Sequence, residues 1–550
     1  LKDAGHYSNV GIGHTRWATH GVPTDVNSHP HCSCDKKVAV VHNGIIENYA
    51  VLKDELIEKG YIFSSDTDSE VAAQLFSYLY TGDLLETIMK VRDRIRGSYA
   101  LGIIHEEQPD KIICTRKESP LIIGLGKDKN FIASDVPAIL KYTRDVIFLE
   151  NDEIAVIEEG KVTVFDKEGK PIEKEVTKIE WDMEQASKNG YPHFMLKEIE
   201  EQPAVVERTL EVYIKPDGKV DFGKAFEKID FEKIKEIDII ACGTAYHAGL
   251  QAAYFFKKMA KIKTNVDIAS EFRYSDPFLN EDNLVIFISQ SGETLDTLMA
   301  LKLARSKGAK TLAITNVVGS TISREADVVL YTVAGPEISV ASTKAYTTQV
   351  VTFYLLALYV AFKCNRVTLE EYESYLDKIY SLSEKIGKMF FNKEKIEKIA
   401  QEVKDRKNGF YIGRGIDEKI TREGSLKMKE ITYIHTEAFP AGELKHGPIA
   451  LIEEGTMIVV VSTQRDMVEK VASNIKELKA RGAFVISVTK ADYKEILDVS
   501  DRVILIDDID DMVAPLLSMI PLQLLSYYTA VAKGLDVDKP RNLAKSVTVE

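Results

Sequence analysis

The densest group of chemically active side chains lies within Glu423–Pro448. After residue 424, the first half of this segment has no glycine or proline, which predicts a helix with Glu423, Lys427 and Glu430 on one face. A loop containing glycine and proline follows and carries His446. The group suits proton transfer, in which Glu430 moves a proton, His446 titrates near neutral pH and Lys427 fixes or accepts charge. The alternative interpretation is a solvent-exposed helix face, on which each Glu–Lys pair stabilises the helix by only about 0.2–0.5 kcal/mol.

A second polar group follows a short apolar run in the middle of the chain. It consists of Ser289, Gln290, Ser291 and Thr294 around a glycine, and a helical pattern begins directly after it. In a parallel sheet this position faces the ligand, because helix N-termini point their free N–H groups there. Such donors suit a phosphate group, although an ordinary helix cap would show the same pattern. The corresponding later loop, Ser462–Asp466, has no glycine and carries charge, so we expect one phosphate site.

The elements that position both groups repeat along the chain. From about residue 230, apolar strand segments end in polar or glycine-containing turns and lead into helical patterns, and the order recurs at an offset close to 172 residues. This doubled pattern predicts two α/β domains with parallel sheets. Residues 1–178 are instead rich in strand patterns, with helical patterns at Asp68–Tyr80 and Asp83–Ile95. Sheets layered with helices are expected there.

Composition limits the classes of partner. The chain has 550 residues, with 71 Lys and Arg against 85 Asp and Glu and a formal net charge of -14, which argues against a nucleic-acid or membrane partner. The longest apolar run, Val350–Phe362, is too short to span a bilayer and predicts a buried helix. Five scattered cysteines favour a reducing cytoplasm. The crowded segment His29–Cys34 lacks the ligand spacing of a zinc site, so no metal is expected.

Five motifs are long enough to be specific. They are His14–Gly21 (HTRWATHG), His42–Ile46 (HNGII), Ser289–Thr294 (SQSGET), Glu443–Pro448 (ELKHGP) and the tail Pro540–Glu550 (PRNLAKSVTVE). In this order, and over essentially the whole chain, they resemble the glutamine–fructose-6-phosphate aminotransferase (isomerizing) family, also called glucosamine-6-phosphate synthases.

The resemblance implies a fold with three domains. An α+β N-terminal-nucleophile glutaminase sandwich (αββα) would be followed by two α/β SIS (sugar isomerase) domains with parallel sheets. The expected boundaries are 1–178 for the glutaminase domain, 179–228 for a linker, 229–375 and 392–540 for the SIS domains, and 541–550 for a C-terminal tail. The strand-rich first third and the internal repeat agree with this plan.

The resemblance also implies a reaction. D-Fructose 6-phosphate and L-glutamine would give D-glucosamine 6-phosphate and L-glutamate, the first step toward UDP-N-acetylglucosamine, in a cytoplasmic homodimer without a cofactor. Two alternatives stay open: a non-catalytic SIS protein that senses a sugar phosphate, and a glutamine-independent sugar-phosphate isomerase or deglycase. A sensor would have no use for Glu430, His446 and Lys545 together, and the glutamine motifs argue against the second alternative.

On the glutamine side, the resemblance assigns Arg16 to the α-carboxylate and Asp68 to the α-amino group of glutamine, which their charges complement. Asn43 and the N–H of Gly44 would form the oxyanion hole. The resemblance also places Thr19 and His20 in the glutamine pocket. It places Trp17 at the gate of an internal ammonia channel.

The family's glutaminase nucleophile is an N-terminal cysteine. The printed sequence starts at Leu1, so we expect the glutaminase step to be inactive in this chain. Cys32 and Cys34 lie after the HTRWATHG motif and are not expected to replace the nucleophile.

On the sugar side, Glu430 would move a proton between C1 and C2 through an enediol, and His446 would open the sugar ring. Lys545 would form a Schiff base with the open-chain ketose, helped by a pKa lowered through burial near Lys427. Ala245 stands where some members have a phosphate-contacting serine, which removes a hydrogen bond worth about 1–2 kcal/mol. The implied phosphate and sugar contacts are Thr244, Ser289, Gln290, Ser291, Thr294, Val340 and Ala544.

Overall fold

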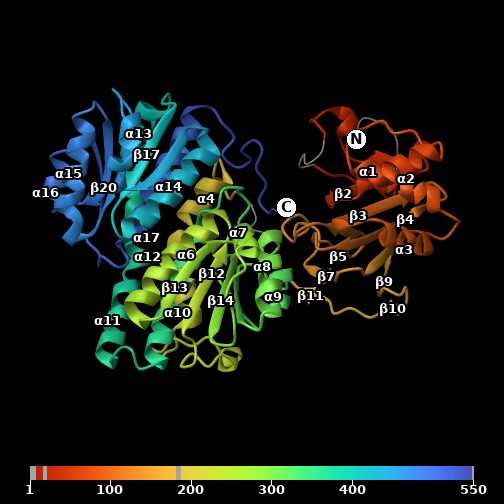
Figure 1. The fold of residues 1–550 in the computed structure, drawn as a ribbon, viewed down its shortest axis with the longest axis horizontal. Helices are drawn as coiled ribbons and strands as arrows, with labels where there is room; N and C mark the ends of the chain where they lie inside the picture. Colours follow the sequence, from red (N-terminus) through yellow and green to blue (C-terminus); the bar gives the residue numbers. More distant parts are fainter. Residues whose placement is uncertain (1–7, 16–20, 181–186, 548–550) are drawn as a thin grey trace. The chain divides into compact units, whose positions relative to one another are not determined.

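The computed structural model describes residues 8–15, 21–180 and 187–547. They belong to two compact units (Figure 1). The first unit is the chain up to residue 186, and the second is made of residues 187–292 and 296–545, while 293–295 and 546–550 are grouped with the first. Each unit has its own sheets and its own hydrophobic cores.

The described residues of the first unit form two antiparallel sheets. The larger has the strand order β1-β2-β3-β4-β8-β9-β10, and the smaller has the order β11-β7-β5-β6. Their bounds are β1 His31–Cys32, β2 Val38–Ile46, β3 Gly97–His105, β4 Gln108–Lys117, β5 Ile122–Leu125, β6 Asn130–Ala133, β7 Asp145–Phe148, β8 Ile154–Glu158, β9 Lys161–Phe165, β10 Pro171–Ile172 and β11 Thr177–Lys178.

Three helices pack on one face of the larger sheet, and the smaller sheet packs on the other. Side chains alternate along a strand, so Leu101 of β3 faces the helices while the neighbouring Ala100 faces the smaller sheet. The described residues thus form helix, sheet and sheet layers, three of the four layers expected for the αββα glutaminase sandwich. The helices are α1 Tyr49–Glu58, α2 Ser69–Leu79 and α3 Leu84–Arg94, of which α2 and α3 confirm the two helical patterns.

The second unit contains two five-stranded parallel sheets with one common plan. Their orders are β13-β12-β14-β15-β16 and β18-β17-β19-β20-β21. β17 begins 172 residues after β12, which confirms the internal repeat. The strands are β12 Glu236–Ala241, β13 Lys263–Ile268, β14 Asn283–Ser289, β15 Lys310–Thr315, β16 Val328–Tyr331, β17 Asn408–Gly413, β18 His435–Pro440, β19 Met457–Ser462, β20 Phe484–Lys490 and β21 Arg502–Ile506.

Helices cover both faces of each parallel sheet (Figure 1). In the first sheet α6 and α10 pack on one face and α7, α8 and α9 on the other. In the second sheet α14 and α17 pack on one face and α15 and α16 on the other. Their bounds are α6 Gly243–Phe255, α7 Ala269–Tyr274, α8 Leu295–Ser306, α9 Thr321–Glu325, α10 Lys344–Lys363, α14 Ile416–Thr432, α15 Val468–Lys479, α16 Lys494–Leu497 and α17 Ala514–Ala532.

One hydrophobic core runs through both halves of the second unit. It takes in Ile239 of the first sheet and Val459 of the second, together with side chains of α6, α10, α14 and α17. The helices between the halves also contribute to it; they are α11 Leu369–Tyr380, α12 Leu382–Met389 and α13 Lys393–Val403. The two parallel sheets therefore share one core, so residues from both can contribute to a single site.

Two helices, α10 and α17, are long and apolar enough to cross a membrane by length and composition alone. In both, 89% of the apolar window is buried inside the second unit. Such burial is typical of a central core helix. The expectation that Val350–Phe362 forms a buried helix is confirmed, since it lies within α10.

The segment expected as a linker, 179–228, differs from that expectation. Two helices, α4 (Phe194–Glu200) and α5 (Gln202–Tyr213), lie within it and bury Ile199 and Val206 in the core of the second unit. Its polar composition suggested a solvated linker. Charged side chains of this segment instead form ion pairs with other parts of the second unit, such as Glu200 with Lys393 at 2.7 Å.

Candidate active site

The predicted phosphate loop follows β14 at the carboxyl edge of the first parallel sheet. Ser289 is buried, and its hydroxyl accepts a hydrogen bond from the N–H of Gly292 at 3.0 Å. The carbonyl of Gln290 accepts one from the N–H of Asn316 at 3.2 Å, which ties the loop to the end of β15. These contacts hold a tight turn directly before α8, and the N-terminus of a helix is a position that suits an anion.

Gly292 is required by the geometry of this loop. Its φ of +68° lies in the left-handed region, and a Cβ would lie 2.0 Å from the hydroxyl oxygen of Ser320. Ser291 directly precedes Gly292 in the same loop. Thr294 is grouped with the first unit, so its role beside Ser289 stays a prediction.

A buried ion-pair network joins α6 to α14, and thus the first parallel sheet to the second. The ammonium of Lys427 lies 3.3 Å from Glu423 Oε1 and 2.5 Å from Glu430 Oε2. Lys427 and Glu423 are completely buried, and Glu430 is 20% exposed. The predicted helix and its charged face are therefore confirmed, but the face points into the protein.

Burial and charge oppose each other in this network. Burial alone would lower the pKa of Lys427, but the two neighbouring carboxylates outweigh it, and the pKa is raised above its usual range. Burial would raise the pKa of Glu423, but Lys427 and His247 outweigh it, and the pKa is lowered. His247 Nδ1 lies 2.7 Å from Glu423 Oε2. Lys427 is thus a fixed positive charge beside Glu430.

Thr244 has other partners than the resemblance implies. Its hydroxyl donates to Glu423 Oε1 at 3.0 Å and accepts from Lys427 at 3.0 Å. A threonine hydroxyl has one proton, which is directed at Glu423 here. The phosphate contact expected of Thr244 therefore stays a prediction.

The predicted Schiff-base lysine lies on the C-terminal segment, and its partner is a carboxylate. Lys545 Nζ forms an ion pair with Glu337 and lies 3.3 Å from the hydroxyl oxygen of Ser342. Its side chain is 17% exposed, so the tail is docked on the second unit at this residue. The expected neighbour was the positive charge of Lys427, whereas the observed contact is the negative charge of Glu337.

The remaining sugar-side residues lie in three places. The N–H of Val340 donates to the carbonyl of Asp538 at 3.0 Å, which joins the Glu337 loop to the start of the tail. Ala544 is half-buried beside Lys545. His446 is exposed at the end of the 3-10 helix Glu443–His446, and within the described ranges its side chain has no hydrogen bond or ion pair.

In the second parallel sheet, the loop after β19 donates hydrogen bonds to a carboxylate of the protein itself, Asp417. Asp417 lies in the first turn of α14, 172 residues after Ala245. It accepts hydrogen bonds from the N–H of Thr463 at 2.7 Å and from the Thr463 hydroxyl at 2.6 Å. Burial raises the pKa of Asp417 to about 6, because these hydrogen bonds offset it only in part. The N–H and the hydroxyl of Thr463 are thus engaged by Asp417, while the expectation of one phosphate site stays a prediction.

In the first unit, the described glutamine-side residues lie close together. Asp68 is buried at the N-terminus of α2, and its carboxylate accepts a hydrogen bond from the N–H of Ile46 at 2.8 Å. Ile46 belongs to β2, the strand that carries Asn43 and Gly44. Gly44 has a φ of +128°, and a Cβ there would lie 2.1 Å from the carbonyl oxygen of Ser98. Outside the described residues lie Arg16, Trp17, Thr19 and His20.

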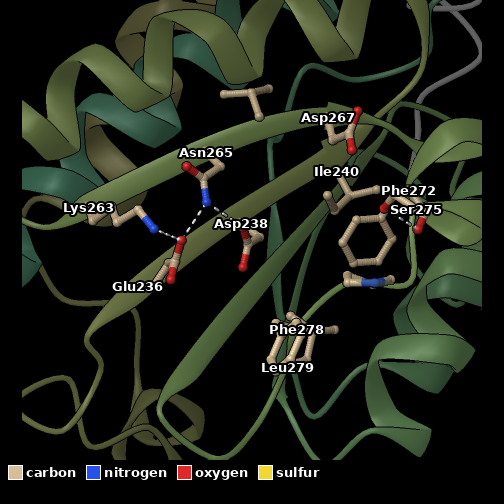
Figure 2. Close-up of a pocket in the computed structure, with 12 residues that line it drawn as sticks. Glu236, Asp238, Ile240, Lys263, Asn265, Asp267, Phe272, Ser275, Phe278 and Leu279 are labelled. Carbon is tan, nitrogen blue, oxygen red and sulfur yellow. Dashed lines mark hydrogen bonds and ion pairs between the residues drawn. The ribbon is translucent and has the colours of Figure 1, made fainter.

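A separate pocket of about 350 Å³ lies beside β12 and the edge strand β13 of the first parallel sheet (Figure 2). Asn265 of β13 donates to Glu236 at 2.6 Å and to Asp238 at 2.9 Å, and Lys263 forms an ion pair with Glu236 at 2.7 Å. No predicted sugar-side residue lines this pocket. We build the candidate active site instead on the ion-pair network of Lys427 and on the contact of Lys545 with Glu337.

Known proteins show the same organisation. The SIS domain model matches residues 230–359 and 402–533, and the glutamine amidotransferase domain model matches residues 14–141. A protein of Fusobacterium nucleatum named glutamine–fructose-6-phosphate aminotransferase (isomerizing) is 60% identical over 550 residues, which are 100% of this chain and 90% of that protein. The chain belongs to this aminotransferase family.

Other members of the aminotransferase family agree. A protein of the same name from Caldanaerobacter subterraneus is 55% identical over 98% of this chain and 89% of its own length. The solved C-terminal domain of glucosamine-fructose-6-phosphate aminotransferase from Francisella tularensis is 41% identical. It covers 64% of this chain and 100% of its own, with a TM-score of 0.62. The two SIS domains of this aminotransferase family member are thus confirmed.

Three site residues of this aminotransferase family member were not predicted from the sequence: His247, Glu337 and Asp417. His247 is 176 residues from its partner Glu423, and Glu337 is 208 residues from Lys545. One signal was present for His247, because it lies three residues after Thr244 in a helix and so shares its face. For Glu337 the sequence offers no such local signal.

Proposed function

We propose that this chain belongs to an enzyme that converts D-fructose 6-phosphate and L-glutamine into D-glucosamine 6-phosphate and L-glutamate. The relatives carry names that describe this reaction. The observation that supports the proposal is the buried charge of Lys427 at 2.5 Å from Glu430. Burying charges is costly unless a fold pairs them, and a sugar-phosphate sensor would gain nothing from that cost. A proton-transferring enzyme needs such a carboxylate with a fixed counter-charge.

In the proposed reaction, Ser289, Gln290 and Ser291 hold the phosphate, and His446 opens the sugar ring. Lys545 forms an imine with the ketone carbon C2. Ammonia released from glutamine then displaces the lysine from C2. Glu430 moves a proton from C1 to C2, which leaves an amino group on C2 of an aldose.

We propose further that the protein is a cytoplasmic homodimer in which Asn43, Gly44 and Asp68 serve the glutamine pocket. Family membership supports these assignments. For the pocket, a further support is that Asp68 is fixed by the strand that carries the other two residues.

The variant Glu430→Gln tests the proposal. The amide keeps the shape of the side chain but cannot take up a proton, so isomerisation of fructose 6-phosphate to glucose 6-phosphate should fall by about 10²–10⁴-fold. Calorimetry should show sugar-phosphate affinity within about twofold of the unmodified chain, because the base makes little contribution to ground-state binding. Glu384→Gln is the matched control, since Glu384 forms an exposed pair with Lys388. Isomerisation by Glu430→Gln at the control's rate would remove Glu430 from the mechanism.

A further inference from the structure

A fully buried carboxylate receives Lys545. Glu337 lies just before α10, and its side chain is 0% exposed. Its Oε1 accepts hydrogen bonds from the N–H groups of Thr343 at 2.9 Å and Ala345 at 3.0 Å, and its Oε2 accepts one from the hydroxyl of Ser342 at 2.7 Å. Three neutral donors therefore hold this carboxylate in place, and Lys545 supplies the positive charge.

A second buried carboxyl group, Glu198 of α4, contacts the same loop. Its Oε1 accepts hydrogen bonds from the N–H groups of Ile338 at 2.5 Å and Ser339 at 3.2 Å. Its Oε2 is buried with no hydrogen-bond partner among the described residues. A negative charge on a buried oxygen without a hydrogen bond is costly. Burial, together with the charge of Glu337, therefore raises the pKa of Glu198 to about 8. Burial thus favours the neutral acid form of Glu198.

Glu337 has the opposite charge state. Burial acts to raise its pKa, but Lys545 and the hydrogen bonds outweigh burial and lower the pKa to about 2. The other charged groups around the loop pair among themselves. Lys344 of α10 lies 2.7 Å from Glu201, and Lys197 lies 3.2 Å from Glu201. Glu337 is thus the anion that Lys545 contacts.

We propose that Glu337 is the counterion and proton acceptor of Lys545 during imine formation. The inference rests on the proposed role of Lys545. Lys545 starts as an ammonium ion and passes one proton to the Glu337 carboxylate. Its freed electron pair attacks C2 of the ketone, a C–N bond forms, and the carbonyl electrons go to oxygen, which takes a second proton from the nitrogen. Glu337 then returns its proton to the hydroxyl group, the C–O bond breaks, and water leaves an iminium ion.

The charge balance explains why a buried carboxylate suits this step. The nitrogen carries one positive charge as the ammonium ion and one as the iminium ion, and Glu337 is a carboxylate at both ends. No uncompensated charge is left in the buried site before or after the step. Because Thr343, Ala345 and Ser342 already hold the carboxylate, it does not have to reorganise during the reaction.

The experiment compares Glu337→Gln with Glu198→Gln. Glutamine at 337 keeps an oxygen for the N–H groups of Thr343 and Ala345 but removes the charge, whereas glutamine at 198 replaces a carboxyl group whose neutral form is favoured by burial. Borohydride with fructose 6-phosphate traps the imine, and peptide mapping locates it. We expect trapping on Lys545 to fall by about 10²-fold or more in Glu337→Gln. In Glu198→Gln it should stay close to the unmodified rate.

The affinity for fructose 6-phosphate, measured by calorimetry without borohydride, separates chemistry from folding. It should change by less than about threefold in Glu337→Gln, because binding relies on the phosphate loop rather than on Glu337. Trapping on Lys545 at the unmodified rate or faster overturns the proposal. So does a loss of affinity as large as the loss of trapping, which would make Glu337 structural.

Two further results complete the test. Unmodified protein that carries no label on Lys545 defeats the proposed role of the lysine itself, which is a failure distinct from that of Glu337. If Glu337→Gln does not fold, Glu337→Asp is used. This variant keeps the negative charge, but its side chain is one methylene shorter, so the carboxylate lies farther from Lys545. Slower trapping in Glu337→Asp with unchanged affinity is then expected, and unchanged trapping overturns the proposal.

Discussion

Lys427 illustrates how burial changes the meaning of a common helix pattern. On a solvated helix, its pairs with Glu423 and Glu430 would each be worth about 0.2–0.5 kcal/mol. In the structure Lys427 is completely buried, and the hydroxyl of Thr244 joins the same cluster. Each buried charge is stabilised by its ion-pair partner, because no water is present to solvate it if that partner is removed.

Lys427→Met should therefore destabilise the second unit by about 3–5 kcal/mol, since it leaves buried carboxylate charge without its cation. Urea unfolding followed by circular dichroism measures the change. Lys388→Met is the matched control, because Lys388 forms an exposed i,i+4 pair with Glu384. That control should cost far less stability, because water screens the charges of an exposed pair. Equal costs for the two variants would show that the buried network adds nothing to stability.

At the scale of elements, the loop between β14 and α8 depends on one glycine. Gly292 combines a positive φ with a close approach to Ser320, and Ser289 accepts a hydrogen bond from its N–H. A side chain at Gly292 must displace the loop, because the nearest atom belongs to a short, buried serine rather than to a flexible surface residue.

Gly292→Ala should weaken binding of fructose 6-phosphate at least about tenfold, or about 1.4 kcal/mol, because the loop donors move. Calorimetric titration measures this change. Gly308→Ala is the matched control: Gly308 has a φ of +85°, but no atom lies within 4 Å of an added Cβ. A similar affinity for both variants would contradict a phosphate site in this loop.

At the scale of the whole molecule, the two SIS domains share one fold but differ in the loop after the corresponding strand. The loop after β14 has glycine and hydroxyl groups, whereas the donors of the loop after β19 are engaged by Asp417. We therefore expect titration with fructose 6-phosphate to give one site per chain, because the second loop already holds an anion. Gly292→Ala should weaken that one site. A second site of similar affinity would show that Asp417 does not occupy the equivalent position.

Much of the architecture was determined by the sequence itself. The repeat of strand, turn and helix predicted two parallel sheets, and the periodicity of residues 68–95 predicted α2 and α3, because side-chain spacing and turn chemistry are local properties. The motifs also indicated the family, which the relatives confirm. Local pattern could not identify α4 and α5, whose charged faces resemble a linker until their ion pairs are seen.

The partners of the reactive groups were decided by the tertiary structure. The sequence placed Glu423, Lys427 and Glu430 on one helix face, but only the packing of α14 against α6 decided that this face is buried. Likewise, Lys545 was a candidate from its motif, whereas its partner Glu337 lies 208 residues away. Burial and charge pairing depend on which distant segments meet, and no spacing within one segment contains that information.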